Sequence, residues 1–320
     1  MYKDLQKFGS VKSNEPMAKH TTFKIGGPAE FFVTVEETAK LIDLVRWLDD
    51  QGIPRFVLGG GSNMLASDDG FKGVVINIKT QKSKVTGTTI FAEAGCITVA
   101  IAQLSMQSKL SGFEWGVGVP GTIGGATRGN AGAMGGETKD SVKTVTVLRD
   151  GEVVELVNAE CRFGYRDSIF KHNDDIVLSV TLQLAEAKNS NSMKQALEYL
   201  QYRNKTQPQG FASTGCIFQN IQVNKISSKI KDQLLAQFPD DLEKIEQFFK
   251  LGKISAGWLV EKAGIKGRQV GQVKVSETHG NFVVNLGGAT AHDVLTLIEQ
   301  IKEKVYTETG VTIEEEIQLL

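Results

Sequence analysis

The hydrophobic residues near the N-terminus recur with the period of a helix. The segment 34–51 therefore predicts an amphipathic helix, whose recurring positions are Leu41, Leu44, Val45 and Leu48. Thr34 and Glu37 have the spacing of a capping box, which predicts that this helix begins at Thr34. Gly52 and the nearby Pro54 predict its end.

Short hydrophobic runs bounded by turn residues predict a series of strands, at 56–58, 73–78, 90–94, 144–148, 152–157 and 176–184. A helix is expected over 99–110, ended by Gly112. Asp150–Gly151 separates two of the runs and predicts a hairpin, because both turn positions favour φ > 0. The run 176–184 alternates hydrophobic and polar residues, which predicts a half-buried strand.

The polar stretch AEAKNSNS at 185–192 loses the strand pattern and is our predicted domain boundary. Beyond it we expect helices over 192–203, within 226–252 and after Thr290, and strands at 270–275, 281–286 and 311–319. The helix that Thr290 caps has one hydrophobic face, formed by Val294, Leu297, Ile298, Ile301 and Val305. The chain is therefore divided into three parts, 1–80, 81–188 and 189–320.

Two glycine clusters interrupt these elements, VLGGGSN at 57–63 and VPGTIGGATRGNAGAMGGE at 119–137. Glycine permits φ > 0 and lets another group approach the main chain closely. A row of backbone N–H groups can then bind an anion without a lysine. VLGGGSN alone is equally well explained as a turn. The pair, each after a strand-like run, favours a phosphate-bearing cofactor held from two sides.

Neither cluster matches the commoner nucleotide-binding motifs. The chain has no G-x-x-x-x-G-K-[ST], which excludes a P-loop, and no G-x-G-x-x-G in the context of a Rossmann site. The four histidines form no recognised metal-ligand spacing, so no metal site is expected.

The overall composition is that of an ordinary globular protein, with 41% hydrophobic and 23% charged residues. The 36 basic and 37 acidic residues nearly balance, which argues against nucleic acid as a partner. Three widely spaced cysteines fit reduced thiols in a cytoplasm. No apolar stretch reaches the about 18 residues that span a bilayer, and the polar N-terminus does not read as a signal peptide. We therefore expect a cytoplasmic protein with no membrane partner.

Eight segments occur in an order that characterises one enzyme family. They are HTTFKIGGPAEFF (20–32), VLGGGSN (57–63), GVPGTIGG (118–125), RGNAGAMGGE (128–137), YRDSIF (165–170), GCIFQN (215–220), SAGWLVEKAGIKG (255–267) and GVTIEEEI (310–317). In this order they resemble the UDP-N-acetylenolpyruvoylglucosamine reductase (MurB) family, flavoenzymes of peptidoglycan precursor synthesis. The resemblance extends from His20 to Ile317.

The resemblance implies an α+β fold, with a two-subdomain FAD-binding fold of the vanillyl-alcohol-oxidase type followed by a C-terminal α+β substrate-binding domain. It implies a non-covalently bound FAD, NADPH as reductant and a nucleotide sugar, UDP-N-acetylglucosamine enolpyruvate, as substrate. The flavin would be reduced by NADPH and would then pass hydride to the enolpyruvyl group, giving UDP-N-acetylmuramate. No pattern in the sequence fixes the oligomeric state, and we expect a monomer.

The resemblance also assigns residues to the FAD site. From the first cluster it selects Gly59, Gly60, Gly61, Ser62 and Asn63, and from the second Pro120, Gly121, Thr122, Gly125, Asn130, Ala131 and Gly132. Their shared property is exposed backbone N–H groups that can face a pyrophosphate.

Three residues match catalytic positions of the family. Arg166, taken alone, reads as a surface arginine paired with Asp167; at its motif position it would stabilise the enolate that hydride addition creates. Cys216 stands where most relatives have serine, and a lone cysteine is usually structural; the resemblance makes it the proton donor, and a thiol is the stronger acid. Glu316, third in an acidic run that could be a solvated strand end, would assist protonation or orient the donor.

Substrate contacts are assigned by the resemblance to Arg203, Asn220 and Lys266. Gln219 and Ile221 depart from the family's usual residues beside Asn220, so the manner of diphosphate binding stays open. Two other functions are compatible with parts of the pattern. One is a flavin-dependent alcohol or sugar oxidase of the same fold, against which the three C-terminal segments argue. The other is a catalytically decayed FAD- or nucleotide-binding module, which the presence of Arg166 and Glu316 disfavours.

Overall fold

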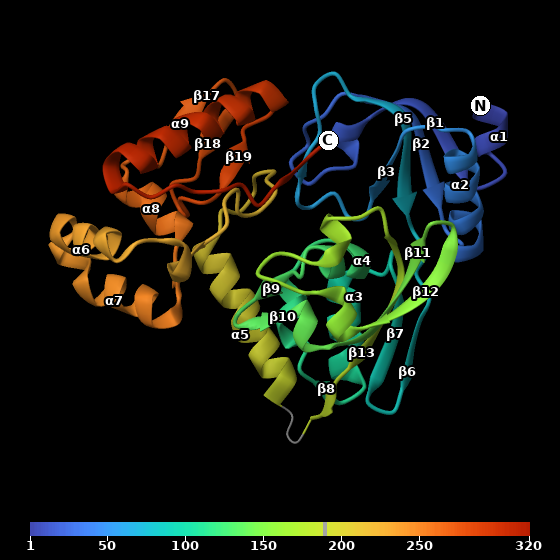
Figure 1. The fold of residues 1–320 in the computed structure, drawn as a ribbon, viewed down its shortest axis with the longest axis horizontal. Coiled ribbons are helices and arrows are strands. Elements are labelled where there is room, and N and C mark those ends of the chain that lie inside the picture. Colours follow the sequence, from blue (N-terminus) through green and yellow to red (C-terminus); the bar gives the residue numbers. More distant parts are fainter. Residues whose placement is uncertain (188–190) are drawn as a thin grey trace. The chain divides into compact units, whose positions relative to one another are not determined.

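The computed structural model describes residues 1–187 and 191–320, which form two compact units (Figure 1). Unit 1 comprises Met1–Pro16, Pro28–Gly61 and Gly70–Lys205, and unit 2 comprises Met17–Gly27, Ser62–Asp69 and Thr206–Leu320. Each unit has a hydrophobic core of its own. The predicted boundary at 185–192 includes residues 188–190, which lie outside the described residues. The three-part division of the chain stays a prediction.

Unit 1 contains a four-stranded sheet in the order β1-β2-β5-β3. Its strands are β1 (Ser10–Pro16), β2 (Pro28–Val35), β3 (Arg55–Leu58) and β5 (Phe71–Ile78). Strand β5 is parallel to both β2 and β3, and it is buried from Gly73 to its end because neighbouring strands flank both its edges and its faces are covered. The predicted strands 56–58 and 73–78 are confirmed, whereas β1 and β2 were not predicted.

Helix α2 (Thr38–Asp50) packs its predicted hydrophobic face into the core of unit 1, where Leu41, Leu44, Val45 and Leu48 are all buried. The predicted capping box is wrong. Thr34 lies inside strand β2, where it pairs with Ser10, and the helix begins after Glu37. Gly52 adopts φ +63° directly behind the helix, as its position predicted.

A second, antiparallel sheet of unit 1 has the order β12-β11-β13-β7-β6. Its strands are β6 (Ser83–Thr86), β7 (Thr89–Glu93), β11 (Val142–Arg149), β12 (Glu152–Val157) and β13 (Ile176–Gln183). The predicted hairpin is confirmed, since Asp150 and Gly151 adopt φ +50° and +79°. The prediction of a half-buried strand is wrong. Strand β13 is buried on both faces over its first five residues because it lies between β11 and β7 with helix α4 (Ile123–Arg128) packed on it.

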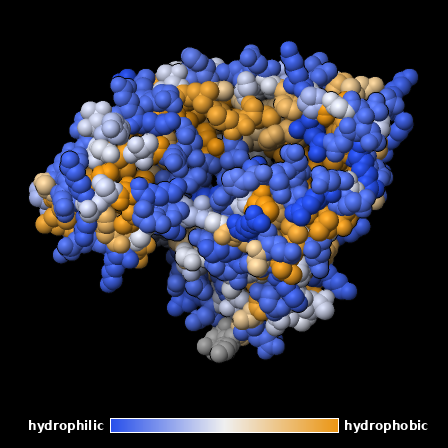
Figure 2. Space-filling model, viewed as in Figure 1, coloured by the Kyte–Doolittle hydropathy of each residue, from blue (hydrophilic) through white to orange (hydrophobic). Residues whose placement is uncertain are grey.

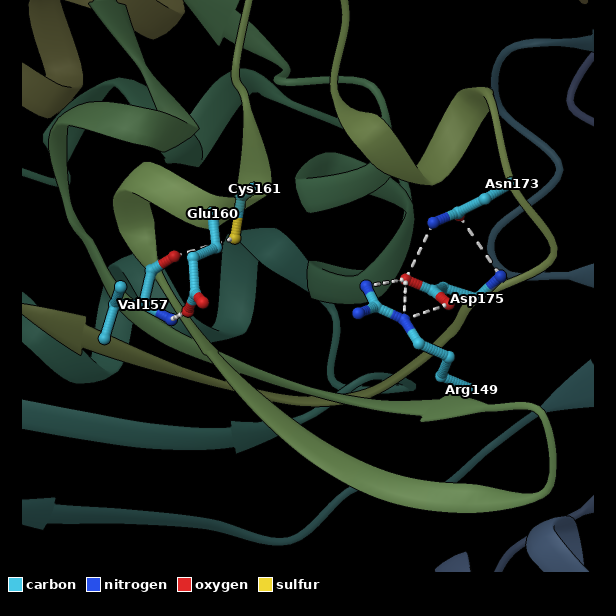
Figure 3. A network of polar contacts seen from close by, with 6 residues as sticks. All are labelled: Arg149, Val157, Glu160, Cys161, Asn173 and Asp175. Carbon is cyan, nitrogen blue, oxygen red and sulfur yellow. Dashed lines mark hydrogen bonds and ion pairs between the residues drawn. The ribbon is translucent and has the colours of Figure 1, made fainter.

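Polar contacts hold the ends of this sheet (Figure 3). Arg149, the last residue of β11, donates from Nη2 and Nε to the carboxylate of Asp175 at 2.7–3.2 Å, and Asn173 donates to the same carboxylate at 2.9 Å. In the turn after β12, the Cys161 thiol donates to the Val157 carbonyl at 3.5 Å. Cys161 is therefore part of a structural turn.

The remaining elements of unit 1 are short, apart from α3 and α5. They are α1 (Tyr2–Leu5), α3 (Thr98–Gln107), β8 (Leu110–Ser111), η2 (Glu114–Gly118), β9 (Gly132–Ala133), β10 (Gly136–Glu137), η3 (Thr138–Asp140), η4 (Asn158–Cys161), η5 (Ile169–Lys171), β14 (Ala185–Glu186) and α5 (Asn191–Thr206), which belongs to this unit up to Lys205. Helix α3 ends earlier than predicted because Lys109 adopts φ +55° and β8 follows at once.

Unit 2 is built on α9 (Ala291–Thr309) and a three-stranded antiparallel sheet of β17 (Gln269–Val270), β18 (Val273–Val275) and β19 (Val283–Asn285). Thr290 caps α9 as predicted, since its hydroxyl accepts the Asp293 N–H at 3.0 Å. The single strand predicted at 270–275 is wrong, because Gly271 (φ +49°) turns the chain and makes a hairpin.

The other elements of unit 2 are η1 (Met17–Lys19), β4 (Met64–Leu65), β15 (Ile221–Gln222), η6 (Val223–Lys225), α6 (Ser228–Gln237), η7 (Pro239–Asp241), α7 (Leu242–Leu251), β16 (Lys253–Ile254), α8 (Ala256–Lys262) and β20 (Gln318–Leu319). The predicted strand 311–319 is mostly wrong. Only β20 is regular, parallel to β4, while residues 314–316 make isolated bonds to residues 217–219.

The surface in Figure 2 is largely hydrophilic, with separate patches of hydrophobic residues. Within the described ranges, no helix combines the length and apolar character that crossing a membrane requires.

Candidate active site

The two glycine clusters of the sequence meet in unit 1. Gly59 and Gly60 follow directly after β3, and a Cβ atom placed on Gly60 would lie 2.4 Å from the Cα of Gly121. A Cβ on Gly59 would lie 2.6 Å from the Thr122 hydroxyl oxygen. Both distances are shorter than any real carbon contact, so only glycine lets the two segments approach backbone to backbone. Gly121 itself adopts φ +105°, which also requires glycine.

The second cluster continues into the short helix α4, whose first N–H groups bond the residues directly after β7. The N–H groups of Ile123 and Gly124 donate to the carbonyls of Cys96 (2.8 Å) and Ala94 (2.9 Å). Thr122 caps the helix by accepting the Gly125 N–H at 3.3 Å. No helix was predicted here, because two glycines stand in its first turn. The cap and the contacts to β7 therefore determine this helix.

Gly124 and Gly125 face in different directions. A Cβ on Gly124 would lie 2.8 Å from the Ala94 Cβ, so this residue is packed against the sheet. Gly125 is exposed, and the nearest atom to its Cβ position among the described residues is the Thr122 hydroxyl oxygen at 3.5 Å. Unit 1 thus presents open, side-chain-free backbone at Gly125, next to the Gly60–Gly121 contact.

Asn130 links the second glycine cluster to the turn that carries the predicted catalytic arginine, Arg166. Its side chain is fully buried, and Nδ2 donates to the carbonyl of Gly164 at 2.6 Å and to Glu137 at 3.0 Å. Its Oδ1 accepts the Lys139 N–H at 3.0 Å. Asn130 was predicted as an FAD ligand, and the structure places its amide entirely among protein groups.

Arg166 lies in a tight turn. Gly164 and Asp167 exchange backbone hydrogen bonds of 2.9 and 3.4 Å across it, and Lys171 donates to the Arg166 carbonyl at 2.7 Å. Arg166 adopts φ +54°, a conformation that costs a residue other than glycine about 1 kcal/mol or more. The surrounding hydrogen bonds hold it there, so the half-buried side chain starts from a fixed backbone.

Arg203 of α5 packs on Gly118, the residue directly before the second cluster. A Cβ on Gly118 would lie 2.4 Å from the Arg203 Cδ, so the arginine stem crosses a position without a side chain. The other predicted FAD residues differ in exposure: Gly61 is buried, Ser62, Ala131 and Gly132 are half-buried, and Pro120 is exposed.

In unit 2, the segments that carry Cys216 and Glu316 lie side by side. The Glu316 N–H donates to the carbonyl of Ile217, the residue after Cys216, at 2.7 Å. The Gln219 N–H donates to Glu314 at 2.9 Å in the same pairing. Residues that are a hundred positions apart in the sequence are thus neighbours, as a shared role in proton transfer requires.

Cys216 differs from the other two cysteines in its surroundings. It is half-buried, whereas burial raises the pKa of the Cys96 and Cys161 thiols to about 11 each. Near neutral pH those two thiols stay protonated and unreactive, because the thiolate is the reactive form.

The three glutamates of the acidic run 314–316 have different surroundings. Glu314 lies 3.8 Å from Lys225, and Glu315 pairs with Lys302 at 3.0 Å, a hydrogen bond that raises the pKa of Lys302. Glu316 is half-buried, and its carbonyl accepts a hydrogen bond from the Asn63 side chain at 3.1 Å. The Asn63 side chain therefore supports the Glu316 backbone, and its contact with FAD stays a prediction.

The predicted substrate residues of unit 2 flank helix α8. Asn220 Oδ1 accepts the Ala256 N–H at the start of this helix (3.1 Å), and Lys266 lies 3.4 Å from Glu261 near its end. His279 and Asn281 were missed by the sequence analysis. A Cβ on Gly257 of α8 would lie 3.1 Å from the His279 ring, and His279 Nδ1 accepts the Asn281 N–H at 3.2 Å. The only available signal was a T-H-G-N turn between two strands.

Comparison with known proteins places these features in one family. Residues 29–157 match the FAD binding domain family, and residues 207–320 match the UDP-N-acetylenolpyruvoylglucosamine reductase C-terminal domain. The chain is 37% identical over 321 residues to the UDP-N-acetylenolpyruvoylglucosamine reductase of Caldanaerobacter subterraneus subsp. tengcongensis, covering 99% of this chain and 96% of that protein. The chain belongs to the UDP-N-acetylenolpyruvoylglucosamine reductase family. The Clostridioides difficile reductase is 36% identical over 314 residues, 97% of this chain and 93% of that one.

A solved structure agrees with this family membership. The chain resembles the crystal structure of the MurB reductase from Thermus caldophilus with a TM-score of 0.76 and 31% identity, over 97% of this chain and 98% of that one. The predicted fold class is confirmed: an α+β chain with an FAD-binding domain followed by the C-terminal domain of this family.

The residues of unit 1 fit an FAD. The contacts of Gly59 with Thr122 and of Gly60 with Gly121 leave no room for a Cβ, so the two clusters present side-chain-free backbone next to one another, as a backbone-lined pyrophosphate site requires. Gly125 adds exposed backbone whose Cβ position meets only the Thr122 hydroxyl oxygen, at 3.5 Å. These four glycines would hold the cofactor; the individual FAD contacts stay predictions.

Substitution of the exposed Gly125 and of the packed Gly60 should both weaken FAD binding, but for different reasons. Gly125→Val should weaken FAD retention at least about tenfold without lowering the stability of the apoprotein, because valine is no worse than glycine in a helix and enters open space. Gly125→Ala should retain more FAD than valine does. Gly60→Val should lower both FAD retention and apoprotein stability, because it forces the Gly121 backbone away. Flavin absorbance after gel filtration and urea unfolding of the apoproteins measure this, and a Gly125→Val protein that keeps its FAD would contradict the assignment.

Proposed function

We propose that this protein reduces UDP-N-acetylglucosamine enolpyruvate to UDP-N-acetylmuramate, with NADPH as reductant. The enolpyruvyl double bond gains a hydride on one carbon and a proton on its neighbour, while NADPH becomes NADP⁺. A bound FAD supplies hydride transfer from the one substrate to the other. The observation that carries the proposal is the likeness to named reductases over 97–99% of the chain. The three free thiols support a cytoplasmic setting.

Arg166 would stabilise negative charge on the substrate. Hydride addition leaves an electron pair on the carbon that bears the carboxylate, which an always-charged, forked guanidinium can stabilise as an enolate. The turn that Asn130 holds supports this role, because a strained backbone with fixed partners keeps a cation from reorganising during the reaction.

Cys216 and Glu316 would supply the proton. The pairing of Ile217 with Glu316 supports a joint role, since it fixes the backbone of the two residues next to one another. Glu314 and Glu315 form ion pairs with Lys225 and Lys302, and the family motif selects the third glutamate of the run, Glu316, for this chemistry. Arg203, Asn220 and Lys266 would bind the nucleotide-sugar diphosphate, to which they offer two cations and an amide.

Anaerobic mixing tests this function directly. NADPH should bleach the flavin absorbance of the purified protein, and subsequent addition of the enolpyruvyl nucleotide sugar should restore it with formation of one UDP-N-acetylmuramate per flavin. A reduced flavin that reoxidises with dioxygen but ignores the enolpyruvyl substrate would contradict the proposal and favour an oxidase.

Arg166→Lys should slow the second half-reaction far more than the first. Lysine keeps the charge but loses the planar fork, so substrate-driven reoxidation should fall roughly a hundredfold while reduction by NADPH stays within about threefold. Stopped-flow absorbance resolves the two steps. Equal slowing of both steps would argue against enolate stabilisation.

The Cys216 variants test the proton donor. Cys216→Ala should slow single-turnover reoxidation by about 10²–10⁴-fold, the usual range of general acid catalysis, and Cys216→Ser should retain more activity. Cys96→Ala and Cys161→Ala are the matched controls and should turn over like the parent. A maleimide at pH 7.5 should label Cys216 first, since burial keeps the pKa of the other two thiols near 11. Parental reoxidation in Cys216→Ala would place the donor elsewhere.

A further inference from the structure

We propose that Asn281 is the positioning residue that sets the Cys216 thiol for proton transfer, an inference that rests on the proposed function. Asn281 is 3% exposed, and its side chain bonds to both polar groups of one backbone residue. Oδ1 accepts the Phe218 N–H at 2.9 Å, and Nδ2 donates to the Phe218 carbonyl at 2.7 Å. Its own carbonyl accepts the Ile217 N–H at 2.9 Å.

Through these bonds Asn281 holds one side of the segment that follows Cys216. On the opposite edge the segment pairs with residues 314–316. Phe218 is 1% exposed. Without the Asn281 amide, its N–H and carbonyl would stay buried and would lose these hydrogen bonds. Such groups cost about 1–3 kcal/mol each. The segment would move to satisfy them, and Cys216 lies only two residues away.

His279 supports the Asn281 backbone in turn. Its Nδ1 accepts the Asn281 N–H at 3.2 Å, which requires the neutral ring. Burial lowers the pKa of His279, and the charge of Lys266 lowers it further, while Glu261 acts in the opposite direction. The ring is therefore a hydrogen-bond acceptor at neutral pH, and the turn from His279 to Phe282 is held in one geometry.

Asn285 provides a matched control in the same hairpin. It is also buried, at 6% exposure, and it also bonds backbone groups at both ends of its amide. Nδ2 donates to the Phe23 carbonyl at 2.9 Å, and Oδ1 accepts the Gly287 N–H at 2.8 Å. None of these side-chain bonds reaches the segment 216–219. Asn285 therefore contributes to stability as Asn281 does, but it does not hold the backbone next to Cys216.

The substitution Asn281→Asp separates positioning from stability. The carboxylate keeps the acceptor for the Phe218 N–H but loses the donor and repels the Phe218 carbonyl. At pH 8, substrate-driven reoxidation in the holoenzyme should fall at least about tenfold, with reduction by NADPH unchanged. As the pH is lowered through the pKa of the new carboxyl group, protonation restores the donor, so the ratio of variant to parent rate should rise. Asn285→Asp should lower the Tm similarly and show a pH-independent ratio near one.

The outcomes are distinguishable. An Asn281→Asp enzyme that slows both half-reactions equally, or whose ratio to the parent does not depend on pH, would overturn the inference. If Asn281→Asp does not fold with FAD, His279→Ala is measured instead. It should slow reoxidation and enlarge its solvent isotope effect, and an unchanged isotope effect would equally overturn the inference. A parent enzyme that never reoxidises with the enolpyruvyl substrate would instead overturn the proposed function itself.

Discussion

The close approach of two glycine backbones is the constraint on which unit 1 depends. Gly60 and Gly121 come together at a distance that excludes any side chain, and Thr122 fills the space beside Gly59. This contact joins the end of β3 to the start of α4, which is itself bonded to the residues directly after β7. We propose that this contact builds the anion-binding part of the FAD site from backbone alone, without the motifs of a P-loop or a Rossmann site.

From this contact, hydrogen bonds extend to the residues proposed to act on the substrate. Asn130 passes from the second cluster to the turn of Arg166, so the cation and the cluster share one support. In unit 2 the same principle recurs with other partners. Asn281 and Asn63 hold the backbone of the Cys216 and Glu316 segments, respectively, through buried or half-buried amides. In each case an asparagine side chain satisfies backbone groups that a longer strand would otherwise pair. The residue proposed to act on the substrate therefore lies in irregular backbone.

The sequence predicted those elements whose signal is local. The hydrophobic spacing of α2, the Asp150–Gly151 hairpin and the Thr290 cap each depend on residues within a few positions, and all three are confirmed. Thr34 misled because a capping pattern also occurs by chance in a strand, where pairing with Ser10 decides the structure. Helix α4 was missed because its glycines oppose a helix and only contacts to β7 and the Thr122 cap impose it.

The candidate site shows the same limit. Motif order predicts Arg166, Cys216 and Glu316 as catalytic residues, and the backbone bond of Ile217 with Glu316 places the Cys216 and Glu316 segments next to one another. The FAD contacts of Asn63 and Asn130 stay predictions, and the sequence did not indicate that their side chains bond backbone carbonyls of the Glu316 and Arg166 segments. The T-H-G-N turn did not reveal the role of Asn281, because its contribution depends on a side chain bonding a backbone sixty-three residues away. Periodicity and motifs do not encode such pairings.

Hydrogen exchange of the apoprotein with and without FAD shows whether the two glycine clusters bind the cofactor together. Peptides covering residues 57–63 and 119–132 should show the largest slowing of amide exchange when FAD binds, because we expect their backbone N–H groups to face the cofactor. Tight FAD binding with unchanged exchange in both peptides would contradict this assignment.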